Sequence, residues 1–345
     1  MNDDKGCKNQ EGIFVVSRRK QSLDMGLKKD TGVSTALRII NENRIFLIII
    51  FLGLIMKFIA PTFLTKYNIL YIFQDIAVPG IIACGCLMLM IGGYFDLSVG
   101  ANVALTGAIV AKLSTGGISI PVVLLVVLIL GAVIGIVNAI VVIYFRVNSI
   151  VATLSMLSIL RGILLLYSKE HIITGIPDPF LWFGMGSIGF LPVLDLFLIL
   201  TAILCYVILQ KSVFGRHIYA IGSNRMSAFL TGIKVDSVLT KVYMFEGILT
   251  SFAGFLFVTK YSAALPTAAM GLEITIIAAI IVGGARLFGG KGTIFNTIGG
   301  VVLMEMIFNA INLTNVNLNW RFIIQWLIII FAVTYTVMLK ESPDE

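Results

Sequence analysis

Charged residues are scarce in this 345-residue chain, at 12% against the ~25% typical of soluble proteins. Apolar residues make up 58%, above the ~45–50% of a soluble domain. The first 44 residues also hold 15 of the 43 charged side chains, so the rest of the chain is poorer still in charge. A water-soluble fold cannot bury so much apolar surface. The composition therefore predicts an integral membrane protein.

Histidine and cysteine are also scarce, with two and four residues. Two histidines argue against a histidine-based metal centre. The cysteines do not form a disulfide framework, and Cys84-Gly-Cys86 lacks metal-site spacing. The first 44 residues contain no early apolar core, so no cleavable signal peptide is predicted. We expect no metal site, no cofactor and no catalytic residue in this chain.

A nucleotide-binding loop is missing too. Residues 284–292 (GARLFGGKG) resemble one superficially, but Ala285 stands where the first glycine is needed and Gly292 replaces the Ser/Thr that would hold magnesium. Any ATP hydrolysis must therefore come from another chain. The net charge of +7 lies beside the ends of apolar segments, so no nucleic-acid partner is expected.

Long apolar runs are abundant, and they have the length of membrane-spanning helices rather than the alternation of a β-barrel. We predict an all-α polytopic membrane protein with about ten spans, at residues 43–60, 68–92, 98–114, 119–145, 149–167, 189–210, 241–260, 272–286, 293–313 and 321–339. The third and eighth are short, and Pro79-Gly80 interrupts the second. Broken or short helices are expected near 92–100 and 272–292, because such breaks require protein or water to satisfy the backbone.

The distribution of Lys and Arg predicts the orientation in the membrane. With both termini in the cytoplasm, 18 of the 25 Lys/Arg fall on the inner side and six on the outer side. This divides the chain into a charged cytoplasmic segment (1–42), a transmembrane domain (43–340) and a short cytoplasmic tail (341–345). Residues 168–188 form an outer loop, a candidate cap or docking surface. Residues 211–240 form an inner loop.

The inner loop is predicted to contain a short surface helix over residues 224–230. Ser223 and Asn224 are good N-cap residues, and Gly232 is a good stop. From the pattern alone, this helix is as compatible with a passive surface element as with a docking element.

Polar residues inside the spans are candidates for function, because burying them in lipid is costly. Asp96 is either the N-cap of the next helix or part of a polar feature near a solute path. Gly131 and Gly135 form a small-xxx-small packing face. Amides within apolar helices either join helices or bind a hydroxylated solute weakly. The other candidates are Asn138, Arg161, Glu246, Glu273, Glu305, Asn309 and Asn312.

Several segments together resemble the membrane-spanning permease subunits of bacterial ABC importers for monosaccharides, the ribose/xylose/galactose group. The resemblance runs from about Asn68 to Lys340. It rests on Phe95–Gly100, Asn138, Tyr144–Val147, Ala152–Leu154, Met156–Gly162, Gly215-Arg216, Tyr219-Ala220, Gly222, Asn224, Ala228, Gly232-Ile233, Pro266-Thr267, Gly271, Glu273, Ala278-Ala279, Gly283-Gly284, Gly289–Gly292, Asn309 and Asn312-Leu313.

The resemblance implies a multi-pass protein of the bacterial plasma (inner) membrane that moves a monosaccharide or similar small polar solute. It implies a second permease subunit, identical or homologous, an ATP-binding subunit that uses the ATP, and an external solute-binding protein. The residues it implies for coupling to the ATPase are Gly215, Arg216, Gly222, Asn224, Ala228 and Gly232. The residues expected along the translocation path are Asp96, Asn138, Thr153, Glu273, Asn309 and Asn312.

The chain departs from the family pattern at several points. Asn148 stands where proline is frequent, Thr275 where many sugar permeases have an acid, and Arg225-Met226 where an acidic pair is common. The solute could therefore instead be a sugar-like signal, a polyol or a nucleoside. Two rivals come from other classes: an ion-coupled secondary transporter, which should show paired repeats and several buried acids, and a structural membrane scaffold.

Overall fold

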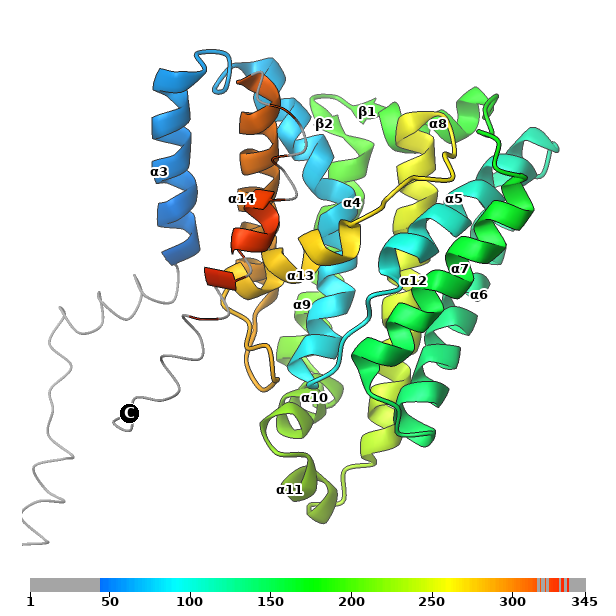
Figure 1. The fold of residues 1–345 in the computed structure, drawn as a ribbon, viewed down its shortest axis with the longest axis vertical. Coiled ribbons are helices and arrows are strands. Elements are labelled where there is room, and N and C mark those ends of the chain that lie inside the picture. Colours follow the sequence, from blue (N-terminus) through cyan, green and yellow to red (C-terminus); the bar gives the residue numbers. More distant parts are fainter. Residues whose placement is uncertain are drawn as a thin grey trace, which may run out of the picture. The chain divides into compact units, whose positions relative to one another are not determined.

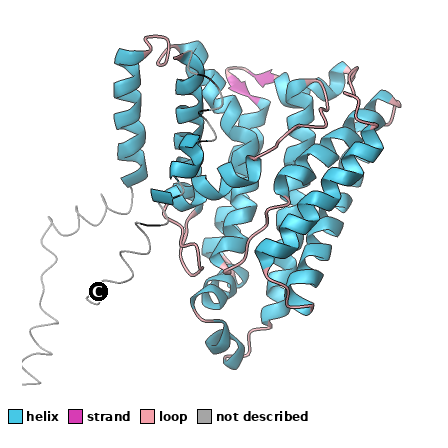
Figure 2. Ribbon diagram, viewed as in Figure 1, coloured by secondary structure: helices cyan, strands magenta, loops and turns pink. Residues whose placement is uncertain are grey.

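The described part of the chain is almost entirely helical. The computed structural model describes residues 44–314 and, beyond them, residues 317, 320, 323–328, 330–331 and 334. Within these residues the strands form a single hairpin (Figure 2), in which β1 (Ser187–Ile188) pairs antiparallel with β2 (Leu191–Pro192). The predicted all-α class is confirmed.

The helices carry the labels of Figure 1. They are α3 (Arg44–Ile59), α4 (Lys66–Ile91), α5 (Val99–Thr115), α6 (Ile120–Ala139) with the π-helical turn η1 (Ile140–Tyr144), α7 (Ser149–Ser168), α8 (Asp178–Met185), α9 (Val193–Lys211), α10 (Val213–Ser223), α11 (Arg225–Leu230), α12 (Val235–Tyr261), α13 (Leu272–Val282) and α14 (Ile294–Leu313).

Six of the described helices are long and apolar enough to cross a membrane: α4, α6 with η1, α7, α9, α12 and α14. Three shorter apolar helices, α3, α5 and α13, match the first, third and eighth predicted spans. The chain is therefore a multi-pass membrane protein. The tenth predicted span (321–339) lies largely outside the described residues, as do the segments 1–42 and 341–345, so the count of ten stays a prediction.

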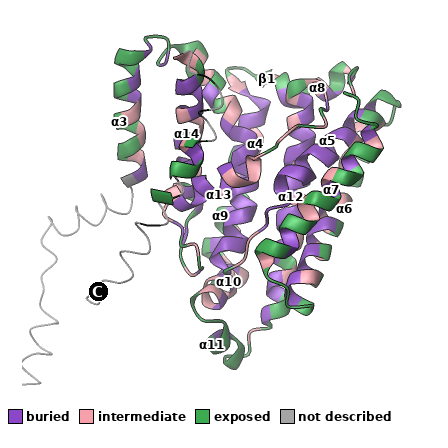
Figure 3. Cartoon of the chain, viewed as in Figure 1, coloured by how far each residue is buried: buried purple, intermediate pink, exposed green. Residues whose placement is uncertain are grey.

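The least apolar spans lie inside and the most apolar outside. About 78% of the membrane-length stretch of α4 is buried and 72% of that of α12, against 28% for the more apolar α6. Figure 3 shows the same contrast between the buried α4 and α12 and the exposed outer faces of α3, α6 and α7. A lipid-facing helix must be apolar on its outer side, whereas an enclosed one can carry polar groups that its neighbours satisfy.

The glycine face predicted on α6 packs directly on α12. A methyl group at Gly135 would lie 2.2 Å from the carbonyl oxygen of Tyr243, and one at Gly131 would lie 2.3 Å from that of Gly247. A methyl group at Gly247 would in turn lie 2.2 Å from the Gly131 carbonyl oxygen. The two backbones therefore approach as closely as helices can, and the predicted packing face is confirmed.

Replacing Gly135 by valine should destabilise the protein strongly, because the added side chain meets backbone that cannot rotate away. Overpacking of this kind costs about 1–3 kcal/mol or more. The effect is measured as the melting temperature of the purified protein in detergent, which is monitored through the loss of the monodisperse chromatographic peak. Gly53→Ala is the matched control, since its methyl group meets only the Met306 side chain at 3.8 Å. Equal melting temperatures for the two variants would contradict the prediction.

Two helices begin inside the bundle. The break before α5 falls within the predicted region 92–100, whereas the break before α13 precedes the predicted region 272–292, which holds the short helix α13 itself. Residues 92–98 separate α4 from α5, and residues 262–271 separate α12 from α13; Figure 1 shows α5 and α13 starting part-way along the neighbouring long helices. Their first turns meet, because a methyl group at Gly100 would lie 2.3 Å from Glu273 Oε2 and 2.6 Å from the Ala269 carbonyl oxygen. The N-termini of two half-helices thus face the same interior point.

The N-cap of α5 corrects one expectation. The cap is Ser98, two residues beyond Asp96, and the Asp96 carboxylate binds the backbone N–H of Ser98 instead. Asp96 lies in the non-helical segment, which continues to Ser98 before the helix begins.

The segment 211–240 is more ordered than a loop with one helix. The predicted helix is present as α11, and Asn224 Oδ1 accepts a hydrogen bond from the Ser227 N–H at 2.9 Å. A second helix, α10, precedes it and was not predicted, although Ser212 is its N-cap and accepts from the Gly215 N–H at 3.0 Å. Figure 1 places α10 and α11 at one end of the bundle and α8 with the hairpin at the other.

Candidate functional site

A cluster of buried polar side chains holds the break before α5. Asp96 Oδ1 accepts from the Ser98 N–H and from the Ser98 hydroxyl, both at 2.6 Å, and Asp96 Oδ2 accepts from Asn138 Nδ2 at 2.8 Å. Thr153 Oγ1 accepts from the Leu97 N–H at 3.0 Å. We call Asp96, Ser98, Asn138 and Thr153 the break cluster; all four are buried. The cluster ties the non-helical segment to α6 and α7.

The inner face of α12 continues this polar interior. The Tyr243 hydroxyl donates to the Phe95 carbonyl oxygen at 3.1 Å. One turn further on, the buried Glu246 accepts from Thr250 Oγ1 at 2.6 Å. Ser251 Oγ donates to Asn102 Oδ1, on α5, at 2.8 Å. These partners explain why α12 can be both enclosed and relatively polar.

A cavity of about 420 Å³ lies between α4, α12, α13 and α14, at the turn that precedes α13. Its walls are mostly polar and aromatic, and they include the carbonyl-rich turn before α13. We call it the α4–α14 cavity. It is lined by Tyr71, Asp75, Val78, Pro79, Phe257, Lys260, Tyr261, Ala269, Met270, Gly271, Leu272, Thr275, Glu305, Phe308, Asn309, Asn312 and Gln325.

Five of the six residues predicted for the path separate into two groups, and Glu273 lies apart from both. Asp96, Asn138 and Thr153 belong to the break cluster and do not line this cavity. Asn309 and Asn312 do line it.

Asn309 is also a helix-joining residue. Its Nδ2 donates to Asn68 Oδ1 at 2.9 Å, and Asn68 Nδ2 donates back to Asn309 Oδ1 at 2.8 Å. This reciprocal pair fixes the start of α4 against α14. Both uses that the sequence allowed for an interior amide, joining helices and facing a cavity, therefore meet at this residue.

Glu273 lies where the half-helices meet rather than in the cavity wall. Its Oε2 is packed against Gly100 and has no hydrogen-bond partner among the described residues. Arg161 Nη1, on α7, donates to the Pro266 carbonyl oxygen at 3.2 Å, which holds the segment 262–271 against α7. The segments 96–100 and 266–273, which both contribute to the family resemblance, are thus in contact.

An ion pair in the cavity wall was missed from the sequence. The Lys260 ammonium, at the end of α12, pairs with Asp75 on α4 and also donates to the Gln74 carbonyl oxygen at 3.1 Å. The two charges are separated by 185 residues, so no local spacing links them. The sequence did contain a signal, because one acid and one base stand in otherwise apolar segments. The acid is also close to Pro79, which has no N–H and so weakens the helical hydrogen bonding there.

The predicted coupling residue Gly222 lies at a tight contact between three segments. A methyl group at Gly222 would lie 1.7 Å from the Ile91 carbonyl oxygen, which also accepts from the Gly290 N–H at 2.8 Å. The Tyr219 hydroxyl donates to the Gly292 carbonyl oxygen at 2.7 Å, and burial raises the pKa of this phenol, which keeps it a donor. We call Ile91, Tyr219, Gly222, Gly290 and Gly292 the α4–α10 junction.

The other predicted coupling residues have distinct places. Gly215 and Ala228 are buried, Asn224 caps α11, and Gly232 ends it with φ +87°. Arg216, Asn224 and Gly232 are exposed, and Arg216 is the charged one of the three.

Three exposed apolar side chains on α11 were missed. Met226, Phe229 and Leu230 are 67%, 65% and 76% exposed, on a helix of six residues. The sequence predicts a surface helix over 224–230, but it does not show that the apolar side chains of this helix stay uncovered in the chain.

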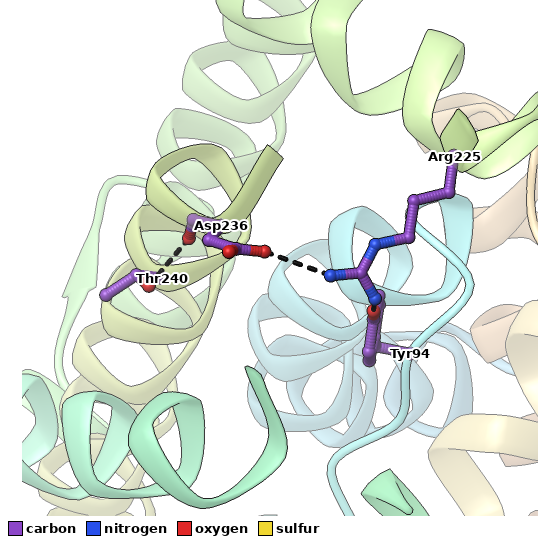
Figure 4. Close-up of polar contacts among 4 residues, drawn as sticks. All are labelled: Tyr94, Arg225, Asp236 and Thr240. Atoms are coloured by element: carbon purple, nitrogen blue, oxygen red, sulfur yellow. Dashed lines mark hydrogen bonds and ion pairs between the residues drawn. The ribbon is translucent and has the colours of Figure 1, made fainter. Parts of the chain in front are cut away.

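Arg225, one of the departures from the family pattern, has partners within the chain. Figure 4 shows its guanidinium between Asp236 Oδ1, at 2.9 Å, and the Tyr94 hydroxyl. Thr240 Oγ1 donates to the Asp236 carbonyl oxygen at 2.7 Å, within α12. The contact links α11 to α12 and to the turn after α4. Both charged side chains are more than half exposed, so their attraction stabilises the protein only weakly.

Comparisons with known proteins agree with this arrangement. Residues 68–333 match the family described as "Branched-chain amino acid transport system / permease component". The chain is 34% identical over 311 residues to "Ribose import permease protein RbsC" of Haemophilus influenzae, covering 89% of this chain and 96% of that one. It is 34% identical to the protein of the same name in Bacillus subtilis, covering 84% and 90%.

The chain is also 32% identical to "D-allose transport system permease protein AlsC" of Escherichia coli, covering 81% of this chain and 86% of that one. No solved structure matches it. The half-helices and the polar break are consistent with the family match. This chain belongs to the branched-chain amino acid transport system / permease component family, whose members are transport components rather than enzymes.

Proposed function

We propose that this chain forms the path by which a monosaccharide or a related small polar solute crosses the plasma membrane, as the permease subunit of an ABC importer. The observation that carries the proposal is the polar α4–α14 cavity beside α13, within a helical membrane protein. The relatives, named as permeases for ribose, arabinose, allose and galactose, support the class of solute.

The proposed orientation places both termini and the α10–α11 end in the cytoplasm, with about ten spans. The exposed Arg216 lies at that end, and the glycine-rich turn at 284–292 with Lys291 meets α10 there. A concentration of Lys and Arg on one side favours that side as the cytoplasmic one. The hairpin and α8 then face outward, where an external solute-binding protein would dock.

The α10–α11 end is the proposed seat of the ATP-binding subunit. Met226, Phe229 and Leu230 present an exposed apolar face, and Arg216 adds a charge beside it. The α4–α10 junction connects this surface to α4, whose far end lines the cavity. ATP bound by the partner then biases the cavity through differential contacts with two states of the permease. A second permease subunit, identical or homologous, completes the importer.

The path is proposed to include the α4–α14 cavity, with Asn309, Asn312 and Thr275 in its wall. Amides and hydroxyls offer a hydroxylated solute hydrogen bonds that are weak enough to be reversible. Asp96, Asn138 and Thr153 act on the path indirectly, by fixing where α5 begins. Glu273 acts where the two half-helices meet.

Reversing the charge of Arg216 is expected to deplete the co-purifying ATPase about tenfold, because an exposed charge at a docking rim governs association with the partner. The wild-type chain and Arg216→Glu are purified in mild detergent from the native membrane, and each co-purifying chain is quantified by mass spectrometry. Lys169→Glu, an exposed charge reversal at the opposite end, is the control and should leave the ATPase bound.

Failure to find any ATPase with the wild-type chain, even after crosslinking, would overturn the importer proposal. The ion-coupled alternative would then be tested by measuring solute uptake into liposomes driven by a proton or sodium gradient. Uptake that persists in the liposomes without any ATPase would favour that alternative.

A further inference from the structure

A second carboxylate near Lys260 has no hydrogen-bond partner on one of its oxygens. Asp195, in the first turn of α9, is 4% exposed, and its Oδ1 has no hydrogen-bond partner among the described residues. A buried acceptor without a donor is destabilising, and such a group in a native fold requires an explanation. The position of Asp195 near the cation Lys260 supplies this explanation.

Lys260 is the cation that acts on Asp195, although it is paired elsewhere. The Lys260 ammonium interacts electrostatically with Asp195 while it forms an ion pair with Asp75. The Lys260 side chain is 14% exposed and that of Asp75 is 21%, so water screens this group only partly. One ammonium is therefore paired with Asp75 on α4 and close enough to act electrostatically on Asp195 on α9.

The two carboxylates lie at similar depth on neighbouring helices. Gly80 of α4 packs on Leu198 of α9, where a methyl group at Gly80 would lie 2.6 Å from Leu198 Cδ1. α4 and α9 run in the same direction, because α10, which directly follows α9, meets the end of α4 at the α4–α10 junction. Three residues back from this contact is Asp195 on α9, and five residues back is Asp75 on α4, so along the helices the two carboxylates lie within about 3 Å of the same level.

A proline stands between the Asp75 end of α4 and the rest of that helix. Pro79 removes one helical hydrogen bond and disfavours straight helix over the preceding turn, which contains Asp75. The part of α4 before Pro79 carries both Asp75 and Tyr71 into the cavity wall. This part can change its angle to α9 and α12 with little loss of internal bonding.

We infer that Lys260 exchanges its partner between Asp75 and Asp195, and that this exchange controls access of the solute to the α4–α14 cavity. With Lys260 on Asp75, as in this structure, the start of α4 is held against α12. With Lys260 on Asp195, the start of α4 is released from α12, while the Asn68–Asn309 pair still holds it on α14, and the free oxygen of Asp195 gains a donor. The inference rests on the proposed function, in that the cavity is taken as part of the transport path.

The test measures cavity access without requiring transport. Met270, which lines the cavity and is 65% exposed, is changed to cysteine, and the rate at which a hydrophilic maleimide labels it is followed in the full-length protein in nanodiscs. Asp75→Asn and Asp195→Asn are each made in this Met270→Cys background. Asp178→Asn, an acid in the first turn of α8, is the matched control.

Asp75→Asn is expected to raise the labelling rate about threefold, because Lys260 is left with Asp195. Asp195→Asn is expected to lower it below the rate of the control, because Lys260 then has Asp75 as its remaining partner. Shifts of the two variants in the same direction, or an Asp195→Asn rate equal to that of Asp178→Asn, would overturn the inference.

A Lys260→Gln background separates partner exchange from local misfolding. If Lys260 is the shared partner, Asp75→Asn and Asp195→Asn should change the labelling rate no further once Lys260 is gone. A persisting effect would also overturn the inference. Labelling needs neither solute nor ATP, so absence of uptake alone would count against the proposed function and leave this result standing.

Discussion

Replacing Gly222 by alanine is expected to reduce solute uptake at least about tenfold while the ATPase still co-purifies. The added methyl group would lie 1.7 Å from the Ile91 carbonyl oxygen, which is backbone and cannot rotate out of the way. Either α10 moves away from α4 or the bond from the Gly290 N–H to Ile91 is lost. Overpacking costs about 1–3 kcal/mol, and ~1.4 kcal/mol acting on one transport state is a tenfold change in rate.

The measurement compares uptake of ribose, arabinose, allose and galactose into cells with the amount of ATPase that co-purifies. Gly162→Ala is the control, because no atom lies within 4 Å of the added methyl group. The exposed side chains of α11 are unchanged in the Gly222 variant, so docking should persist. Loss of both docking and uptake would show that Gly222 only supports the fold of α10, and unchanged uptake would refute a coupling role.

Asp96→Ala is expected to destabilise the folded protein by about 3 kcal/mol or more. The substitution removes the acceptor of the Ser98 N–H and hydroxyl and one of the two acceptors of the Asn138 amide in a buried site, and each such loss costs about 1–3 kcal/mol. Asp96→Asn keeps one acceptor oxygen and should cost less. Thermal melting in detergent, with the amount of folded protein read from size-exclusion chromatography, gives the order of the variants.

A double-mutant cycle with Asn138→Leu tests whether the two residues act together. Because they share a hydrogen bond at 2.8 Å, the double variant should be less destabilised than the sum of the two single variants. Ser155→Ala, on the exposed side of α7, controls for loss of a polar group in a membrane helix. Strict additivity, or an Asp96→Ala protein as stable as the control, would show that the break cluster does not hold the segment 92–98.

These two predictions concern two parts of the protein that differ in function. The break cluster is fully buried and hydrogen-bonded, so it fixes where α5 begins. The α4–α10 junction is a backbone contact between segments that are far apart in sequence. Helix α4 extends from this junction to the cavity. A force on the α10–α11 surface would therefore reach the cavity through α4, which carries Pro79 in the cavity wall.

The sequence alone determined the membrane class, the helical architecture, the break before α5, the short α13 helix and the α11 helix. Each of these depends on local features: the length of apolar runs, the glycines and polar residues that interrupt them, and the Asn224 cap. The glycine face at 131–135 was equally readable, since a repeat every four residues places small side chains on one side of a helix. The ordered motifs also led to the family.

The tertiary structure alone decided which polar residues meet. Asp96, Asn138 and Thr153 proved to be one buried cluster outside the cavity, although their spacing fitted a path equally well. The sequence places a polar side chain on one face of its helix, but its role depends on the hydrogen-bond partner opposite.

For the cavity those partners lie far away along the chain, 241 residues for Asn68 with Asn309 and 185 for Asp75 with Lys260. No local pattern encodes such pairs, because the choice of partner is made by how the helices pack. Packing depends on the whole set of contacts at once, which is why the cavity, its ion pair and the unpartnered Asp195 oxygen appeared only in the folded structure.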